Sequence, residues 1–159
     1  MFARPFIDSV DFARNGRELS GEIQIVTLSR LSDLLANSNG TLSYRVIGLK
    51  EGDRQKLVII LEGMCNLRCQ RCLGELSYPI ELTSHLQLLS AEKLDEVEDD
   101  DEDAIEATKQ LDVLALIEDE LLLSLPFAPR HPDGKCVVPE NDLQQSANPF
   151  AALAVLKKQ

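Results

Sequence analysis

Residues 57–88, LVIILEGMCNLRCQRCLGELSYPIELTSHLQL, decide the fold of this chain. The stretch begins with the apolar, β-branched run 57–61, alternates between apolar and polar positions from 65 to 69, and alternates again from 80 to 88. This period of two is typical of strands that bury one face. Between the two arms lie a Cys-x-x-Cys motif and Gly74, which suit a turn. We therefore predict a hairpin with two cysteines at its corner.

Two further alternating segments, 19–27 and 42–49, precede this hairpin. Strands that follow one another closely along the chain favour antiparallel pairing. We therefore predict an α+β fold with an antiparallel sheet of about four to six strands, which could be barrel-like. Between the first two strands, the helical spacing of Leu28, Leu31 and Leu35 predicts a short helix near 29–37.

Leucines and isoleucines after residue 108 recur at helical spacing. The stripe predicts an amphipathic helix near 109–125 that packs on the sheet and stops before Pro126; it consists of Leu111, Leu114, Ile117, Leu121 and Leu125. The glutamates of the same segment, IEDELLL, are expected on its solvated face. Asn148 followed by Pro149 predicts a second short helix near 149–157, because these residue types suit an N-cap and a first helical position.

The charge of the chain is concentrated in one segment. The 159 residues have a length typical of one domain, so we predict a single domain, 1–159. They carry a net charge of −11, and the run 92–106 holds ten acids and one lysine. Such a run repels itself, so we predict an exposed, flexible loop at 92–106. No stretch approaches the roughly 18 uncharged residues of a membrane span, and no signal peptide is recognisable. We therefore expect a cytoplasmic protein without a membrane partner. The sequence has no phosphate-binding glycine motif, and we expect no small-molecule substrate.

Four cysteines in a reducing compartment suggest metal binding, redox chemistry or simple burial. Cys69 and Cys72 have the spacing of half a zinc site, and His131 and Cys136, which share one later loop, could complete a Cys3His set. Cys65 lies about 13 Å from Cys69 along an extended strand, too far for a shared metal, and is expected to be buried. A metal-free thiol cluster and a redox-active Cys-x-x-Cys motif are the alternatives to zinc.

Several motifs resemble those of the YceD family, the bacterial large ribosomal RNA subunit accumulation proteins. They are CQRCLGEL at 69–76, DVLALIEDELLLSLPFAPRH at 112–131, Cys136 and NPFAALAVLK at 148–157, in the family's order. The resemblance implies a non-enzymatic cytoplasmic factor needed for the synthesis, processing or stability of large-subunit ribosomal RNA. It also aligns Cys69, Cys72, His131 and Cys136 with the family's paired cysteines, later histidine and later cysteine.

If the loop with His131 closes onto the hairpin corner, it gathers four cations there: Arg68, Arg71, Arg130 and Lys135. Phosphates suit such a cluster, so we expect contact with large-subunit RNA or a pre-ribosomal particle. No aromatic residue adjoins the corner in the sequence, which predicts recognition through the RNA backbone and shape. The alternatives are capture of a basic ribosomal protein by 92–106 and a thiol oxidoreductase activity.

Overall fold

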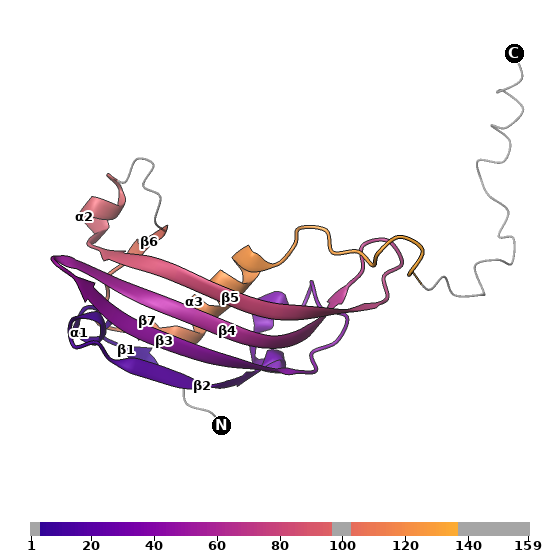
Figure 1. Ribbon diagram of the computed structural model, residues 1–159, viewed down its shortest axis with the longest axis horizontal. Helices are drawn as coiled ribbons and strands as arrows, with labels where there is room; N and C mark the ends of the chain where they lie inside the picture. The colour runs from indigo at the N-terminus through magenta and orange to yellow at the C-terminus, as the bar shows by residue number, and fades with distance from the viewer. Residues whose placement is uncertain (1–3, 97–102, 137–159) are drawn as a thin grey trace, which may run out of the picture.

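The structure, a computed structural model, describes residues 4–96 and 103–136 (Figure 1). In these ranges the chain forms seven strands and three α-helices, which give an α+β fold as predicted. The elements are β1 (Phe6–Ile7), α1 (Ser9–Arg14), β2 (Glu18–Gln24), β3 (Thr41–Glu51), β4 (Arg54–Arg68), β5 (Glu75–Leu89), α2 (Ala91–Leu94), β6 (Asp103–Glu106), β7 (Leu111–Asp112) and α3 (Val113–Ser124).

The main sheet has five strands in the order β2-β3-β4-β5-β6. β2 to β5 pair antiparallel, as predicted, whereas β6 lies parallel to β5. β3 and β4 join through a two-residue turn in which Gly52 has a φ of 60°, a left-handed conformation that glycine adopts without strain. The sheet is open, and the barrel-like alternative is not adopted. β1 and β7 form a separate two-stranded sheet.

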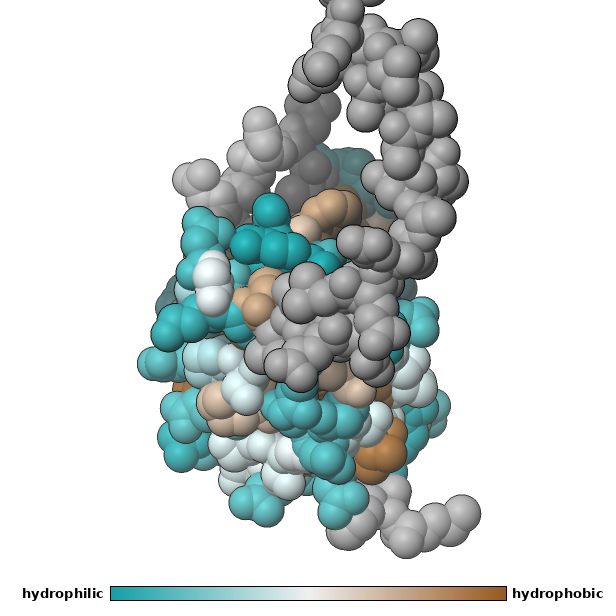
Figure 2. Space-filling view, turned by 90° about the vertical axis from the view of Figure 1, so that its right-hand side faces the viewer, coloured by the Kyte–Doolittle hydropathy of each residue, from teal (hydrophilic) through white to brown (hydrophobic). Residues whose placement is uncertain are grey.

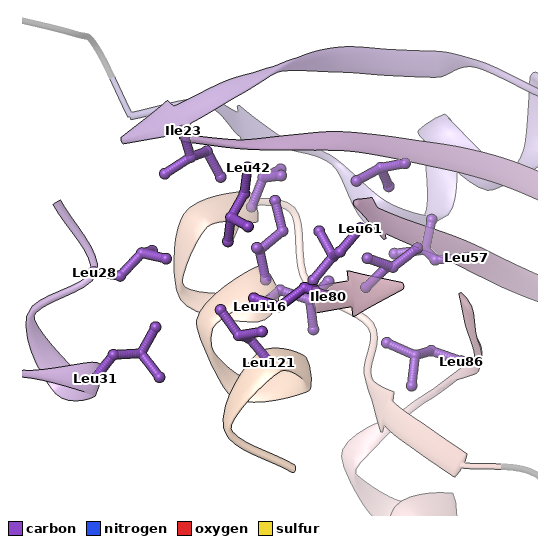
Figure 3. Close-up of a cluster of buried hydrophobic side chains, with 14 of the residues drawn as sticks. Ile23, Leu28, Leu31, Leu42, Leu57, Leu61, Ile80, Leu86, Leu116 and Leu121 are labelled. Carbon is purple, nitrogen blue, oxygen red and sulfur yellow. The ribbon is translucent and has the colours of Figure 1, made fainter. Parts of the chain in front are cut away.

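The core lies between one face of the sheet and α3 (Figure 3). Leu57 and Leu61 of β4 and Leu42 of β3 are fully buried there, in one cluster with Leu116 and Leu121 of α3. Burial of such aliphatic side chains contributes roughly 1.5–3 kcal/mol each before the entropy of ordering is counted. The predicted packing of the helix on the sheet is therefore confirmed.

The boundaries of α3 and the position of its acids differ from the prediction. The helix starts after Asp112, whose carboxylate accepts hydrogen bonds from the backbone N–H groups of Leu114 and Ala115, and it ends at Ser124, before Pro126. Glu118 and Glu120 are only 5% and 8% exposed, so the prediction of a solvated glutamate face is wrong. A tertiary contact accounts for the burial of Glu118, because its carboxylate accepts a 2.7 Å hydrogen bond from the backbone N–H of Arg30.

The predicted helix at 29–37 is also wrong. Two short 3₁₀ helices, Ile25–Thr27 and Ser29–Leu31, occupy this region, and Leu35 forms an isolated bridge with Leu67 at the end of β4. Leu28, Leu31 and Leu35 are all buried, so their spacing reflects insertion into the core from an irregular segment. Short-range backbone hydrogen bonds form the turns of this segment up to Leu34, and its last part bonds to β4 through Leu34 and Ala36.

The two ends of the acidic run, which was predicted to be an exposed, flexible loop, form regular elements. α2 includes Glu92 and Lys93, and β6 occupies 103–106, where Ile105 is partly buried and pairs with Leu88 at the edge of β5. The predicted helix near 149–157 lies outside the described residues. No helix in the described ranges is both long and apolar enough to cross a lipid bilayer.

Candidate metal centre

The hairpin corner forms the first half of the site. β4 ends at Arg68, β5 begins at Glu75 and residues 69–74 connect them, which confirms the predicted hairpin with two cysteines at its corner. Two hydrogen bonds close this loop, from the N–H of Cys69 to the carbonyl of Gly74 and from the N–H of Leu73 to the carbonyl of Cys69, both at 2.9 Å. Leu73 has a φ of 59°, a left-handed conformation that few non-glycine residues adopt. The tight turn holds the two cysteines of the motif close together.

The loop after α3 forms the second half. It leaves the helix at Leu125 and runs to the β4–β5 corner (Figure 1). There the carbonyl of the buried Pro129 accepts a 2.8 Å hydrogen bond from the N–H of Gln70. The N–H of His131 points at the Cys69 sulfur, 3.5 Å away. The two distant pieces of chain therefore meet.

Four ligand atoms converge where they meet. The sulfurs of Cys69, Cys72 and Cys136 and a ring nitrogen of His131 all lie within 4.8 Å of one another. Nδ1 of His131 is 3.4 Å from the Cys72 sulfur and 3.8 Å from the Cys136 sulfur, and the Cys69 and Cys136 sulfurs are 3.8 Å apart. With metal–ligand bonds of about 2.0–2.3 Å, the edges of a tetrahedral zinc site are about 3.5–3.8 Å long. The cluster has the dimensions and donor set needed to hold a metal ion.

The orientation of the histidine ring suits a metal ligand. Nε2 of His131 lies 2.8 Å from the carbonyl oxygen of Glu75, to which it donates, and Nδ1, the nitrogen available to a metal in that tautomer, faces the sulfurs. The side chain of Asn37 in turn donates to the carboxylate of Glu75 at 2.8 Å. Sequence reasoning missed both residues, because a backbone carbonyl has no sequence signature and Asn37 lies far from the motif along the chain.

Two of the thiols differ widely in pKa. Burial on its own raises the pKa of Cys69, but backbone N–H groups of Cys72, His131 and Arg71 and the Cys72 thiol donate to its sulfur, and together they bring the pKa down to about 5. Burial raises the pKa of Cys136. Its hydrogen bonds and Coulombic interactions with Cys69 and Cys72 raise the pKa further, to about 11. At neutral pH Cys69 is therefore a thiolate, the form that binds metals. Because its side chain is buried, reagents in solution reach it poorly.

The four cysteines are free thiols, and the 3.8 Å between the Cys69 and Cys136 sulfurs is far longer than the roughly 2 Å of a disulfide. Cys65 is 3% exposed and packs in the core, which confirms the expected burial. Burial raises its pKa to about 11. His85, expected on the surface, is exposed on β5.

Each of the four predicted cations is the sequence neighbour of one ligand of this cluster. Arg68 precedes Cys69, Arg71 precedes Cys72, Arg130 precedes His131 and Lys135 precedes Cys136, and all four are exposed. Arg71 forms an ion pair with Asp133 at 3.1 Å, and Arg68 donates to the carbonyl of Leu35 at 3.2 Å. Seen from this end of the molecule, the surface of the described residues is mostly hydrophilic (Figure 2).

An aromatic residue also stands on the loop that meets the corner, although none adjoins the Cys-x-x-Cys motif along the chain. Phe127 is two residues before Pro129, the residue bonded to Gln70, and it is fully exposed. Its distance from the Cys-x-x-Cys motif along the chain hid this proximity.

Comparison with known proteins relates the chain to one family. The sequence pattern of the family described as "Large ribosomal RNA subunit accumulation protein YceD" matches residues 57–157, which include the four clustered ligands. A relative from Haemophilus influenzae with the same description is 30% identical over 173 aligned residues, which cover 96% of this chain and 94% of the relative. No solved structure matches the chain.

Proposed function

Because the chain belongs to the YceD family of large ribosomal RNA subunit accumulation proteins, we propose that it acts, without catalysing a reaction, in the accumulation of large-subunit ribosomal RNA. The observation that carries the proposal at the level of residues is the hairpin corner, where four potential metal ligands converge and each is preceded in the sequence by an exposed cation. A rigid cationic surface of this kind suits a phosphate backbone.

We infer that the metal is zinc. Three cysteines and a histidine with tetrahedral spacing form a donor set typical of structural zinc sites, in which protein ligands fill all four positions. Bound zinc would tie the Cys-x-x-Cys turn to the loop of His131 and Cys136. Its role here is to hold the corner in shape.

The four cations are the proposed RNA contacts. Zinc with three thiolates and a neutral histidine carries one negative charge, and Asp133 and Glu75 add two more, so the corner with Arg68, Arg71, Arg130 and Lys135 keeps a net charge of about +1. Arginine can also bind phosphate in a bidentate manner. The acidic α2 and β6 lie at the other end of β5, which at the usual rise per residue is roughly 46 Å long. Screening over such a distance leaves the corner free to attract RNA.

Binding to a fragment of large-subunit ribosomal RNA, measured by fluorescence anisotropy over a range of salt concentrations, tests this contact. About four phosphate contacts give a slope of log affinity against log salt near −3, with roughly 0.7–0.9 per contact. Substituting Arg68→Ala and Arg71→Ala together should weaken binding and make the slope shallower by about 1.5. Lys50→Ala with Arg54→Ala removes two exposed cations, at the end of β3 and the start of β4, which lie at the opposite end of β4 from the corner, and serves as the matched control. Salt-independent binding, or binding that both pairs weaken equally, would contradict the proposal.

Metal analysis of protein purified without chelator tests the zinc site. We expect about one zinc per chain, lost when Cys69→Ser and Cys72→Ser are combined and kept in Cys65→Ser. Stoichiometric zinc in the double variant would show that the metal binds elsewhere.

A further inference from the structure

Phe127 has no role in the fold. Its side chain is fully exposed, so it contributes no apolar burial to stability. The other described phenylalanines are Phe12, which is buried in the core, and Phe6, which is 58% exposed on β1. An exposed ring on an ordered segment is available to a ligand on both of its faces.

The segment that carries this ring is rigid. Phe127 lies between Pro126 and Pro129, and proline fixes its own φ angle and restricts the residue before it. Pro129 is buried, and its carbonyl is tied to Gln70 in the Cys-x-x-Cys turn. Two residues span at most about 7 Å, so the ring is held close to the corner. Binding would therefore order little additional chain.

We propose that Phe127 stacks on an unpaired base of an RNA strand whose phosphates lie on the cations of the corner. This inference rests on the proposed function and narrows the ligand to single-stranded RNA. Bases in an A-form duplex are already stacked and present no free face, whereas proteins that bind single strands combine cations along the backbone with exposed aromatic rings. The exposed cations of the corner, to which the loop of Phe127 is bonded, favour a nucleic acid as the ligand, because its phosphates complement their charge.

The chain contains no tryptophan, so Phe127→Trp introduces a single tryptophan at the proposed stacking position, whose emission can be excited apart from that of the two tyrosines. Stacking of a base on the indole ring should quench its emission when an unstructured RNA 12-mer is added, and the same 12-mer annealed to its complement should quench far less. Phe6→Trp, on the β1 strand that pairs with β7 before the start of α3, is the matched control and should not respond.

Phe127→Ala tests the energetic contribution. We expect its affinity for the 12-mer to fall by roughly 5- to 100-fold, with an unchanged salt slope and an unchanged melting temperature, because the ring contacts neither phosphate nor core. The variant with Arg68→Ala and Arg71→Ala should instead change the salt slope.

These measurements separate the two levels of the proposal. If the wild-type protein binds no RNA, the proposed RNA contact is wrong and the stacking inference falls with it. If the arginine pair weakens binding but Phe127→Ala binds like the wild type, the RNA contact stands and the stacking inference is overturned. Equal quenching by single strand and duplex also overturns the stacking inference. The same holds if Phe127→Trp responds to purified large-subunit ribosomal proteins and not to RNA.

Discussion

At the scale of single residues, the strained backbone at Leu73 leads to a prediction. Its φ of 59° costs an L-residue roughly 1–2 kcal/mol, whereas glycine adopts this conformation freely. The side chain is 67% exposed, so little burial is lost on truncation. Leu73→Gly should therefore be more stable than Leu73→Ala by about 0.5–1 kcal/mol, after the greater freedom of glycine in the unfolded chain is counted. Urea denaturation of the two variants measures this difference, and equal stability would mean that the turn carries no strain.

Cys65 gives a pH-dependent prediction. Its pKa is raised to about 11 in the folded protein, whereas an exposed thiol titrates near 9, so between these values the unfolded chain binds fewer protons than the folded one. The stabilisation is complete below pH 9 and is lost as the pH rises through 11. The stability difference between the wild type and Cys65→Ala should therefore shrink from pH 8 to pH 10.5 in denaturation experiments. Comparing the two proteins cancels other groups that titrate in this range.

The metal-ligand candidates could be predicted from residue types and spacing, because Cys-x-x-Cys at a turn followed by a second loop with histidine and cysteine has few uses. The parts that depend on contacts between distant residues could not. The hydrogen bond from His131 to the Glu75 carbonyl and the closeness of Phe127 to the corner both depend on how the loop after α3 lies across the end of the sheet.

At the scale of elements, α3 provides a direct comparison of two leucines. Leu121 is 1% exposed and packs in the core, whereas Leu123, two positions further along the same helix, is 81% exposed. Leu121→Ala should lower the free energy of unfolding by roughly 2–5 kcal/mol, and Leu123→Ala should change it by less than about 0.5 kcal/mol. Chemical denaturation followed by circular dichroism tests both. A small effect of Leu121→Ala would mean that α3 does not cover the core.

The strands were predictable because alternation reports burial of one face, and β2 to β5 all show it. Two elements could not be predicted. The apolar spacing of Leu28, Leu31 and Leu35 fits a helix as well as an irregular segment pressed into the core, and only the pairing of Leu35 with Leu67 distinguishes the two. β6 exists because the edge of β5 offers hydrogen-bond partners to an acidic segment that has no strand pattern of its own.

At the scale of the whole molecule, the site joins segments that are far apart along the chain. Cys69 and Cys136 are separated by 67 positions. Within the described residues, a few hydrogen bonds and the Arg71–Asp133 ion pair join the two halves of the site. A metal that binds only the folded arrangement stabilises it by mass action, and the closure of a long loop adds to this gain. The corner should therefore depend on the metal more strongly than the sheet and α3 do.

Removal of the metal should produce a local loss of order followed by a modest loss of global stability. After treatment with a chelator, we expect the Gln70 amide, bonded to Pro129, to exchange its hydrogen much faster, while core amides such as that of Ile59 in β4 stay protected. The melting temperature should fall by several degrees and recover when zinc is added. Cys65→Ser should show the same response as the wild type, because Cys65 is no part of the cluster. Equal acceleration of exchange at Gln70 and Ile59 would instead mean that the metal holds the whole fold together. No acceleration at either amide would mean that hydrogen bonds alone keep the loop after α3 on the corner.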